Sequence, residues 1–263
     1  MDIVKIDKLT FRYNDKFIFD KFSLNIKEGS WTSITGSNGS GKSTLIKLIS
    51  GLLKTDHYIE ICNKRINKNT KELIGIVFDN LDDMFICETI EDDLAFILEN
   101  MCYSRMDISK RIKEISKELK IEHLLNKNSY ELSGGEKAKA SLAIALIHNP
   151  KILLLDESLS MIDECDRKDI LNILQEKNKH GLTIISVIHD LRECYLSDRL
   201  IVLNDGEIML DGNPLKVMEK DKILNRLGVS IPFEVDLCIK LKLYGLCEKI
   251  IPDINELVNK LWV

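Results

Sequence analysis

Residues 31–51 have the sequence WTSITGSNGSGKSTLIKLISG, and no other part of the chain says more about its fold. It begins as a short apolar strand, passes through a turn that contains three glycines, and continues as a helix that ends at Gly51. The turn fits the pattern G-x-x-x-x-G-K-[ST] at every fixed position. Glycines allow the backbone to wrap with its N–H groups pointing inward, and the start of a helix adds positive potential. The stretch therefore predicts a strand, a phosphate-binding loop and a helix in succession.

Two side chains of this loop have distinct expected roles. Lys42 would reach the β- and γ-phosphates of a nucleotide, and the hydroxyl of Ser43 would coordinate Mg²⁺. A glycine- and serine-rich turn that matches by chance is the alternative, and the flanking strand and helix argue against it. The predicted ATP-binding residues of the loop are Gly36, Ser37, Asn38, Gly39, Ser40, Gly41, Lys42, Ser43 and Thr44.

The composition of the whole chain is that of a globular protein of one or two domains. Its 263 residues are 44% hydrophobic, and its formal net charge is −5. This charge argues against a generally basic nucleic-acid coat and against a polybasic membrane-surface protein. The seven cysteines never form a Cys-x-x-Cys pair, so we expect reduced thiols. The longest apolar run, residues 140–150, is shorter than the roughly 18–20 residues that a membrane-spanning helix needs.

The periodicity of apolar residues changes along the chain. Residues 1–30 alternate with period two, which predicts strands, whereas residues 88–149 have mainly helical spacing. Short strands are expected between them. The order of elements predicts an α/β fold with a mainly parallel core sheet and a helical insert. Buried strands are expected at 151–155 and 183–188, a helix at about 164–179, a hairpin at 199–210, and interrupted helices over the last forty residues.

An apolar strand over residues 152–155 ends in two carboxylates, Asp156 and Glu157. Buried strands rarely end in this way without a cation or a substrate at the tip. We expect Asp156 to hold Mg²⁺ and Glu157 to orient and polarise the attacking water. A solvated strand end is the alternative interpretation.

Residues 132–136, LSGGE, precede a predicted helix. Two glycines at the start of a helix expose amides to an anion, and Ser133 can act as the N-cap. A simple loop-to-helix cap is the alternative, because such caps are common. The combination with the two motifs above makes the anion-binding hypothesis specific.

Together the motifs at 36–43, 132–136 and 152–157 resemble those of the ABC ATPase family. The resemblance implies a P-loop NTPase (RecA-like) core with an antiparallel β subdomain and a helical subdomain at about 82–149. It also implies an ATPase domain over residues 1–222, and a small C-terminal helical region for dimerisation or assembly over residues 223–263.

The resemblance implies roles for further side chains. Tyr13 lies where the family has an aromatic residue that stacks on adenine, with a surface strand residue as the alternative. His189 matches the switch histidine after a strand, with a structural histidine as the alternative. Residues 158–163 resemble the D-loop. In the family a second chain completes each ATP site, and the residues implied to bind ATP across that dimer are Ser133, Gly134, Gly135, Glu136 and Asp163.

Other segments are similar to the ATPases of energy-coupling factor (ECF) transporters. They are residues 78–85, 89–96, 160–163, 231–237 and 256–262. In that family two ATPases, as homo- or heterodimer, lie under a membrane T subunit and an S component that captures a vitamin or metal ion. The resemblance implies a peripheral ATPase on the cytoplasmic face of the membrane, with ATP and Mg²⁺ as cofactors and no nucleic-acid partner.

Two positions depart from the family pattern. Asp79 stands where Gln is usual; a carboxylate there could coordinate Mg²⁺, but it would repel the γ-phosphate. Glu136 stands where Gln is commoner, near the nucleotide of the opposing chain. Either change could weaken one ATP site. Asp79 also belongs, with Asp82, Asp83 and Glu88, to an acidic segment that the resemblance implies would receive the T subunit, with a solvated acidic loop as the alternative.

Alternative functions remain open at this point. A DNA-maintenance ATPase would need a long heptad insert, and only about ninety residues separate the phosphate-binding loop from residue 132. A translation-associated protein of this family would carry two cassettes. A soluble ATPase scaffold for cofactor assembly, or the ATPase of another ABC importer, is excluded less firmly.

Overall fold

The structure is a computed structural model that describes residues 1–55, 59–160, 162–247 and 249–261. Met161 of the predicted D-loop and Trp262 of the C-terminal motif lie outside the described residues.

A six-stranded sheet forms the centre of the molecule, in the order β10-β9-β3-β8-β7-β6. Strands β6, β7, β8, β3 and β9 are parallel, and β10 is antiparallel to β9. β7 and β8 are buried along their whole length, as their uninterrupted apolar sequences predict. The strands are β3 (Trp31–Gly36), β6 (Ile74–Val77), β7 (Ile152–Asp156), β8 (Thr183–Val187), β9 (Arg199–Asn204) and β10 (Glu207–Gly212).

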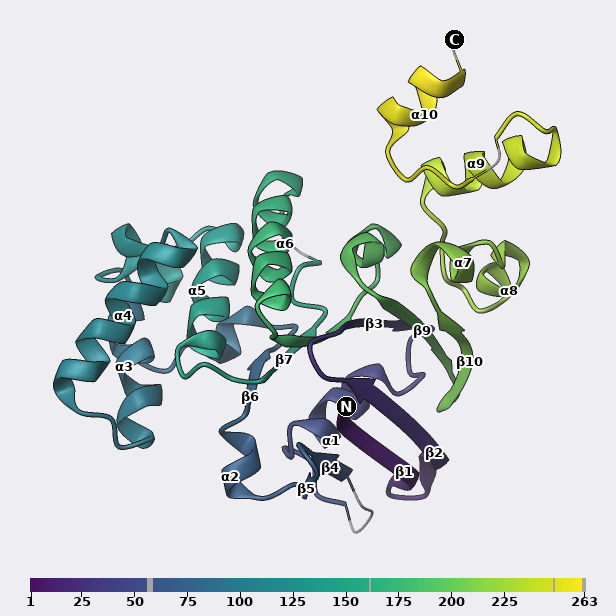
Figure 1. Ribbon diagram of the computed structural model, residues 1–263. Helices are drawn as coiled ribbons and strands as arrows, with labels where there is room; N and C mark the ends of the chain where they lie inside the picture. Colours follow the sequence, from purple (N-terminus) through teal and green to yellow (C-terminus); the bar gives the residue numbers. More distant parts are fainter. Residues whose placement is uncertain (56–58, 161, 248, 262–263) are drawn as a thin grey trace.

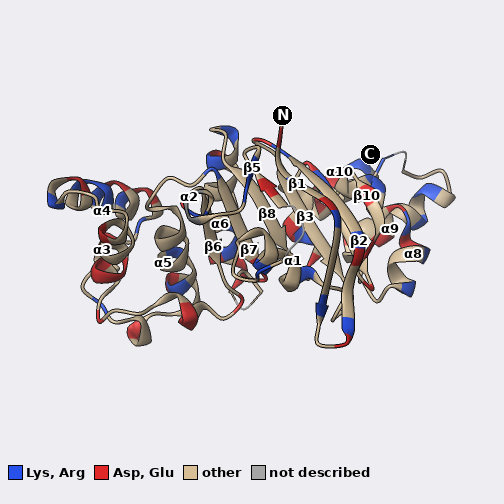
Figure 2. Ribbon diagram, turned by 90° about the horizontal axis from the view of Figure 1, so that it is seen from below, with Lys and Arg blue, Asp and Glu red and all other residues tan. Residues whose placement is uncertain are grey.

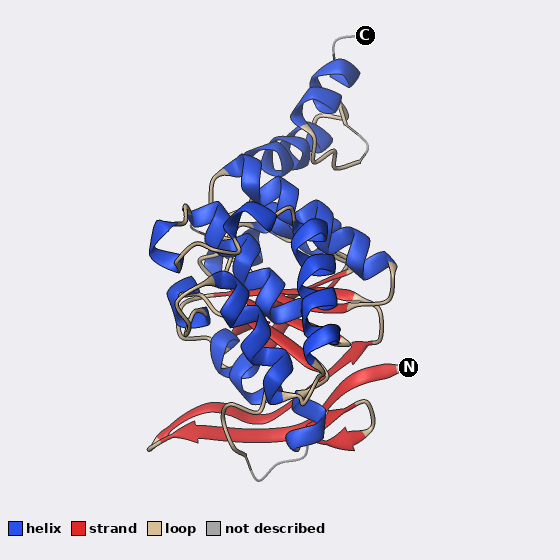
Figure 3. Ribbon diagram, turned by 90° about the vertical axis from the view of Figure 1, so that its left-hand side faces the viewer, coloured by secondary structure: helices blue, strands red, loops and turns tan. Residues whose placement is uncertain are grey.

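A second sheet of four antiparallel strands has the order β2-β1-β4-β5 and packs against α1 (Lys42–Ile49). Its strands are β1 (Asp2–Tyr13), β2 (Lys16–Lys27), β4 (Ile59–Ile61) and β5 (Lys64–Arg65). Figure 3 shows this sheet at one end of the molecule and the C-terminal helices at the other. One apolar cluster joins the inward faces of β1 and β2 to α1 and to the central strands. A one-turn helix, α2 (Lys68–Lys71), lies within the region where only strands were expected.

A helical subdomain is inserted between β6 and β7, on the left of Figure 1. Its long helices are α3 (Ile90–Asn100), α4 (Arg105–Leu119) and α5 (Gly134–Leu146), with short 3₁₀ turns η1 (Leu81–Met84), η2 (Glu122–Leu124) and η3 (Ser129–Glu131). The buried face of α4 repeats at helical spacing and packs into the same cluster as α3 and α5.

The remaining helices follow the central strands. α6 (Glu164–Lys179) joins β7 to β8, and η4 (Leu191–Leu196) joins β8 to β9. After β10 come α7 (Pro214–Met218), α8 (Asp221–Arg226), α9 (Phe233–Leu243) and α10 (Ile254–Leu261). α9 and α10 project away from the sheets in Figure 1. The expected boundary between residues 222 and 223 falls within α8.

The α/β class with its two subdomains is confirmed, including the helix at 164–179 and the hairpin at 199–210. None of the helices in the described part of the chain combines the length and the apolar character needed to cross a membrane.

Candidate active site

The phosphate-binding loop connects β3 to α1, as the sequence predicts. Its last glycine, Gly41, is the N-cap of α1 and has φ +105°, a conformation that favours glycine. A Cβ at Gly41 would lie 2.8 Å from Cζ of Phe19. Both the backbone conformation and the packing against β2 therefore require glycine here. Because Gly41 makes no side-chain cap, the first amides of α1 remain available to an anion.

Lys42 lies across the loop rather than in solvent. Its Nζ donates to the carbonyl oxygens of Gly36 at 3.0 Å and Ser37 at 3.2 Å, and it lies 3.9 Å from Oε1 of Glu157. Burial lowers the pKa of Lys42, and the charges of Glu157 and Asp156 oppose that effect. A buried ammonium group that bonds only to neutral carbonyls of the loop is well placed to gain phosphate oxygens as ligands.

Ser43 and Asp156 meet at the carboxyl end of the central sheet. The hydroxyl of Ser43 donates to Oδ1 of Asp156 at 3.0 Å, and Asp156 is only 2% exposed. Burial raises the pKa of Asp156, and the hydrogen bond from Ser43 opposes the rise. A buried carboxylate beside a hydroxyl is a set of hard oxygen donors that suits Mg²⁺. The residues predicted to hold the metal therefore fit it chemically.

Glu157 and His189 are in contact at the same edge of the sheet. Oε2 of Glu157 lies 2.7 Å from Nε2 of His189, which follows β8. Glu157 has φ +53°, an uncommon conformation for a residue with a side chain, and its backbone N–H donates to the carbonyl of Val187 at 3.1 Å. Such backbone conformations cost free energy and are concentrated at functional sites. The conformation holds the carboxylate between Lys42 and His189.

A hollow of about 390 Å³ opens beside the loop and is lined by Lys16, Ile18, Asn38, Gly39, Gly41, Lys42, Ser43, Thr44 and Glu157. Lys16 and Ile18 were not predicted from the sequence. They belong to β2, and the hairpin register that pairs Tyr13 with Lys16 was the signal that could have found them. Tyr13 is not among the lining residues; its ring is 44% exposed and lies edge-on to Phe11 at 5.1 Å. Stacking of adenine on Tyr13 stays a prediction.

Asp79 lies two residues beyond the end of β6 and is exposed. Its charge helps to raise the pKa of Asp156, so the two carboxylates lie within electrostatic reach of each other. The structure thus places Asp79 in the neighbourhood of the predicted metal site, without a described contact to Ser43 or Asp156.

The LSGGE segment forms the start of α5, where Ser133 is the N-cap and accepts from the N–H of Glu136 at 3.3 Å. None of its residues lines the hollow beside the loop of the same chain. Gly135 has a second, structural reason to be glycine: a Cβ there would lie 1.8 Å from Oδ2 of Asp166 on α6. Nζ of Lys139 donates to Oδ1 of the same aspartate at 2.7 Å. The segment is therefore fixed by packing of α5 on α6.

Asp163 is the N-cap of α6 and accepts from the N–H groups of Cys165 at 2.9 Å and Asp166 at 3.0 Å. One turn later, Arg167 lies 3.8 Å from Asp190 and 3.9 Å from Glu193. Glu193 is 7% exposed, and burial raises its pKa to about 7. No sequence motif marked Arg167 or Glu193, because their proximity depends on packing of η4 against α6.

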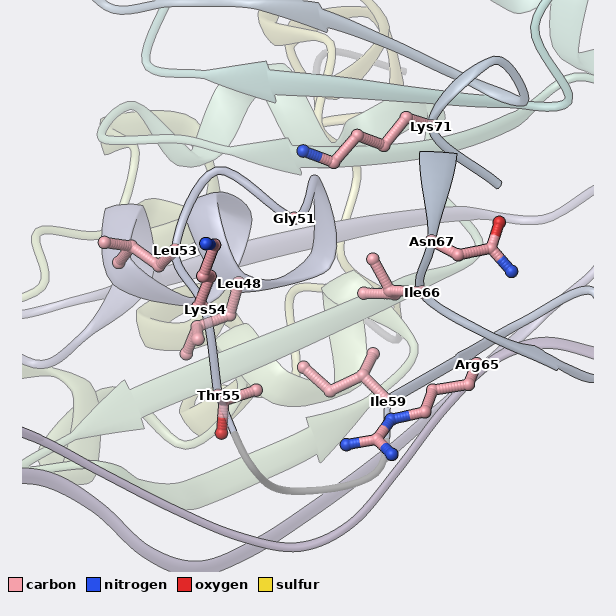
Figure 4. A pocket seen from close by; sticks show the side chains of 10 residues that line it. All are labelled: Leu48, Gly51, Leu53, Lys54, Thr55, Ile59, Arg65, Ile66, Asn67 and Lys71. Carbon is pink, nitrogen blue, oxygen red and sulfur yellow. The ribbon is translucent and has the colours of Figure 1, made fainter. Parts of the chain in front are cut away.

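A second hollow, of about 430 Å³, lies at the opposite end of α1. Figure 4 shows the residues that line it, which include the cationic side chains of Lys54, Arg65 and Lys71 as well as several apolar side chains. It is separated from the phosphate-binding loop by the length of α1, so it is not part of the candidate active site.

Comparison with known proteins agrees with this geometry. Residues 19–160 match the ABC transporter family. The chain is 37% identical over 246 residues to the energy-coupling factor transporter ATP-binding protein EcfA1 of Leuconostoc mesenteroides, over 90% of each chain. It is 38% identical over 245 residues to EcfA of Pediococcus pentosaceus, over 90% of this chain and 88% of the relative.

Two solved structures are also similar. One is CbiO1 from Clostridium perfringens, part of the ABC transporter complex CbiONQ, with a TM-score of 0.77 and 32% identity over 90% of this chain and 98% of that chain. The other is a dimeric ATP-binding cassette in a post-hydrolysis state bound to ADP and Pi, with a TM-score of 0.72 and 28% identity over 80% of this chain and 98% of that chain.

Proposed function

The chain belongs to the ABC transporter family, among the ATP-binding proteins of energy-coupling factor transporters, and from this premise we propose that it energises an importer as one half of an ATPase dimer. It is an ABC-type ATPase that couples ATP hydrolysis to transport. The observation that carries the proposal is the contact of Glu157 with His189 beside Lys42 and the Ser43–Asp156 pair. These five side chains converge at the carboxyl ends of parallel strands, where such folds bind ligands.

Each residue has a defined task in phosphoryl transfer to water. Lys42 and the loop amides hold the phosphates, and Ser43 with Asp156 would hold Mg²⁺. The ion, when bound, supplies positive charge to the transferred phosphoryl group. Glu157 orients the attacking water and accepts its proton. His189 fixes the orientation of that carboxylate through its contact at 2.7 Å.

The site is completed by a second chain in this proposal. Ser133, Gly134, Gly135 and Glu136 lie on the helical subdomain and do not line the hollow of their own chain. Two chains arranged head to tail would present the start of α5 and Asp163 to the nucleotide held by the other. Dimeric assembly of the similar cassette bound to ADP and Pi supports this arrangement.

A surface of the helical subdomain is proposed to receive a membrane T subunit that carries an S component. Its centre is Ile86, 73% exposed, in the loop after η1. The buried Asp93 fixes this loop, because Oδ1 accepts from the N–H groups of Ile86 and Cys87, both at 2.9 Å. Asp83 adds an exposed negative charge, whereas Asp82 forms an ion pair with Lys137. Figure 2 shows positive and negative residues interspersed along the helices of this subdomain, α3, α4 and α5.

The C-terminal region, residues 223–263, is proposed to assist assembly. A small cluster of Cys238, Cys247, Ile251 and Leu257 holds α9 against α10 and the segment between them. Leu243, Tyr244 and Leu246 at the end of α9 are each more than 60% exposed. Exposed apolar side chains on a projecting element suit contact with another subunit. The protein would then act at the cytoplasmic face of the membrane as a peripheral subunit.

Co-purification tests this proposal. The affinity-tagged protein, extracted from membranes in mild detergent, should bring down a second ATPase and an integral membrane subunit. Asp83→Lys should reduce recovery of the membrane subunit while ATP binding is retained, because it reverses a charge on the surface proposed to receive that subunit. Asp7→Lys, an exposed change on β1, is the matched control. Recovery of the ATPase in the cytosolic fraction without a membrane partner would favour the alternative, a soluble scaffold for cofactor assembly.

A further inference from the structure

Glu136 places a negative charge at the end of α5 that is proposed to face ATP. It occupies the third position of the helix, where Oε2 accepts from the N–H of Ser133 at 2.8 Å. The N–H of Glu136 in turn donates to Oγ of Ser133. This capping box satisfies two amides that would otherwise be without a partner.

The other carboxylate oxygen of Glu136 faces two basic side chains. Oε1 lies 3.7 Å from Nζ of Lys127 and 3.7 Å from Nε2 of His123. The hydrogen bond from Ser133 is the main reason that the pKa of Glu136 lies below its usual range, and the charges of Lys127 and His123 add to it. His123 is charged only when protonated, so Lys127 is the permanent cation of the group.

The backbone holds Lys127 in place. Its carbonyl accepts from the N–H of Ile90 at 3.2 Å, and its N–H donates to the carbonyl of Leu124 at 2.9 Å. The segment after η2 is thereby tied to the first residue of α3. Lys127 approaches Glu136 from a fixed backbone position, which makes the pairing a feature of the fold of the helical subdomain.

A carboxylate at a helix N-terminus cancels the positive potential that attracts phosphate. It would also repel the terminal phosphate of ATP at close range once water is excluded. We propose that Lys127 is a positioning residue of the composite ATP site: it neutralises Glu136, so that the amides of Gly134 and Gly135 can receive the terminal phosphate of ATP held by the opposing chain. The inference rests on the head-to-tail dimer proposed above.

This role predicts an effect on closure and not on folding. The side chains of Lys127, Glu136 and His123 are 39%, 30% and 65% exposed in the single chain. Exposed ion pairs contribute little to stability. The same charges interact more strongly when a second chain covers them and displaces water. Loss of Lys127 should therefore change ATP-driven association far more than unfolding.

A double-mutant cycle tests the proposal in the full-length chain that also carries Glu157→Gln, which retains ATP. The measurement is the ATP concentration that gives half-maximal dimer in the presence of Mg²⁺, followed by sedimentation velocity. Lys127→Met should raise this concentration by about three- to tenfold. When Glu136→Gln is also present, Lys127→Met should change it less than about twofold, because no carboxylate then needs a counter-charge. The Lys127→Met effect should shrink as salt is added.

Controls separate the possible failures. Lys110→Met removes an exposed lysine from α4 and should leave closure unchanged. Binding of a fluorescent ATP analogue to the monomer, and urea unfolding, should be the same for Lys127→Met as for its parent. The role of Lys127 would be overturned if Lys127→Met weakened ATP-driven dimerisation equally with Glu and with Gln at position 136. It would also be overturned if Lys127→Met weakened dimerisation in neither background. If the parent does not dimerise with ATP at all, the composite site fails first, and this inference fails with it.

Discussion

Glu157→Gln should stop turnover while ATP binding is preserved or strengthened. The carboxylate lies 2.7 Å from His189 and 3.9 Å from Lys42, and its side chain is 23% exposed. A positioned base typically accelerates proton transfer about 10²- to 10⁴-fold, which corresponds to about 2.7 to 5.5 kcal/mol of barrier. The amide of Gln can still contact His189, but it cannot accept a proton from water. We therefore expect kcat to fall by that factor.

The effect on affinity follows from the charge that is removed. Two unit charges about 4 Å apart attract by roughly 4 kcal/mol at an effective dielectric constant of 20, and by about 1 kcal/mol in water. Partial exposure of Glu157 brings its attraction to Lys42 toward the lower figure. Release of Lys42 from the carboxylate should thus tighten ATP binding by up to about tenfold.

The assay combines steady-state phosphate release with direct ATP binding and sedimentation. Backbone strain at position 157 is the same for Glu and Gln, so the free energy of unfolding in urea should change by no more than about 1 kcal/mol, the lost attraction to Lys42. Glu118→Gln is the matched control, because it removes a carboxylate that is 2.7 Å from Lys177 and remote from the loop. Turnover within threefold of the unmodified protein in the Glu157→Gln variant would refute the assignment, since no other described carboxylate contacts His189.

Three further changes test other parts of the site. Asp79→Gln should raise turnover by about two- to fivefold across a Mg²⁺ titration, because a neutral amide does not repel the γ-phosphate; a fall in turnover and in apparent Mg²⁺ affinity would identify Asp79 as a metal ligand instead. Gly135→Ala should lower the free energy of unfolding in urea by about 1–3 kcal/mol, because its Cβ would collide with Asp166; unchanged stability would contradict the packing argument. Glu193→Gln tests the pKa of about 7 for Glu193 against its ordinary value of 4.5. Between these values the folded chain binds more protons at Glu193 than the unfolded chain does. The free energy of unfolding of the wild type should therefore fall relative to that of the Gln variant, by up to about 3 kcal/mol, as pH rises from about 4.5 to 7. Above pH 7 the difference should stay constant. A difference that stays constant with pH in urea unfolding would oppose this assignment.

Predictions that depended on local backbone requirements were the most successful. The strand, loop and helix over residues 31–51 are encoded by an apolar run, by glycines where the chain turns, and by helix-forming residues up to Gly51. All of these signals act within about twenty residues. The same is true of Asp205 and Gly206 as the turn between β9 and β10.

The charge environment of the motifs was less predictable. From its position alone, Glu136 was expected to be an unfavourable charge, and the acidic segment after β6 was expected to receive a membrane subunit. The fold supplies counter-charges instead: Lys127 and His123 lie near Glu136, and Lys137 pairs with Asp82. These partners come from other segments of the helical subdomain, and no spacing rule connects them.

A nucleotide-phosphate site, with the side chains expected to line it, can be predicted from short stretches of the sequence. How those side chains meet depends on the tertiary fold. Ser43 and Asp156 are 113 positions apart and become hydrogen-bonded because β3, β8 and β7 are neighbours in one parallel sheet, so the loops after them lie at the same edge. Strand order depends on which surfaces pack together across the whole chain, whereas a motif depends on what a few consecutive residues allow the backbone to do.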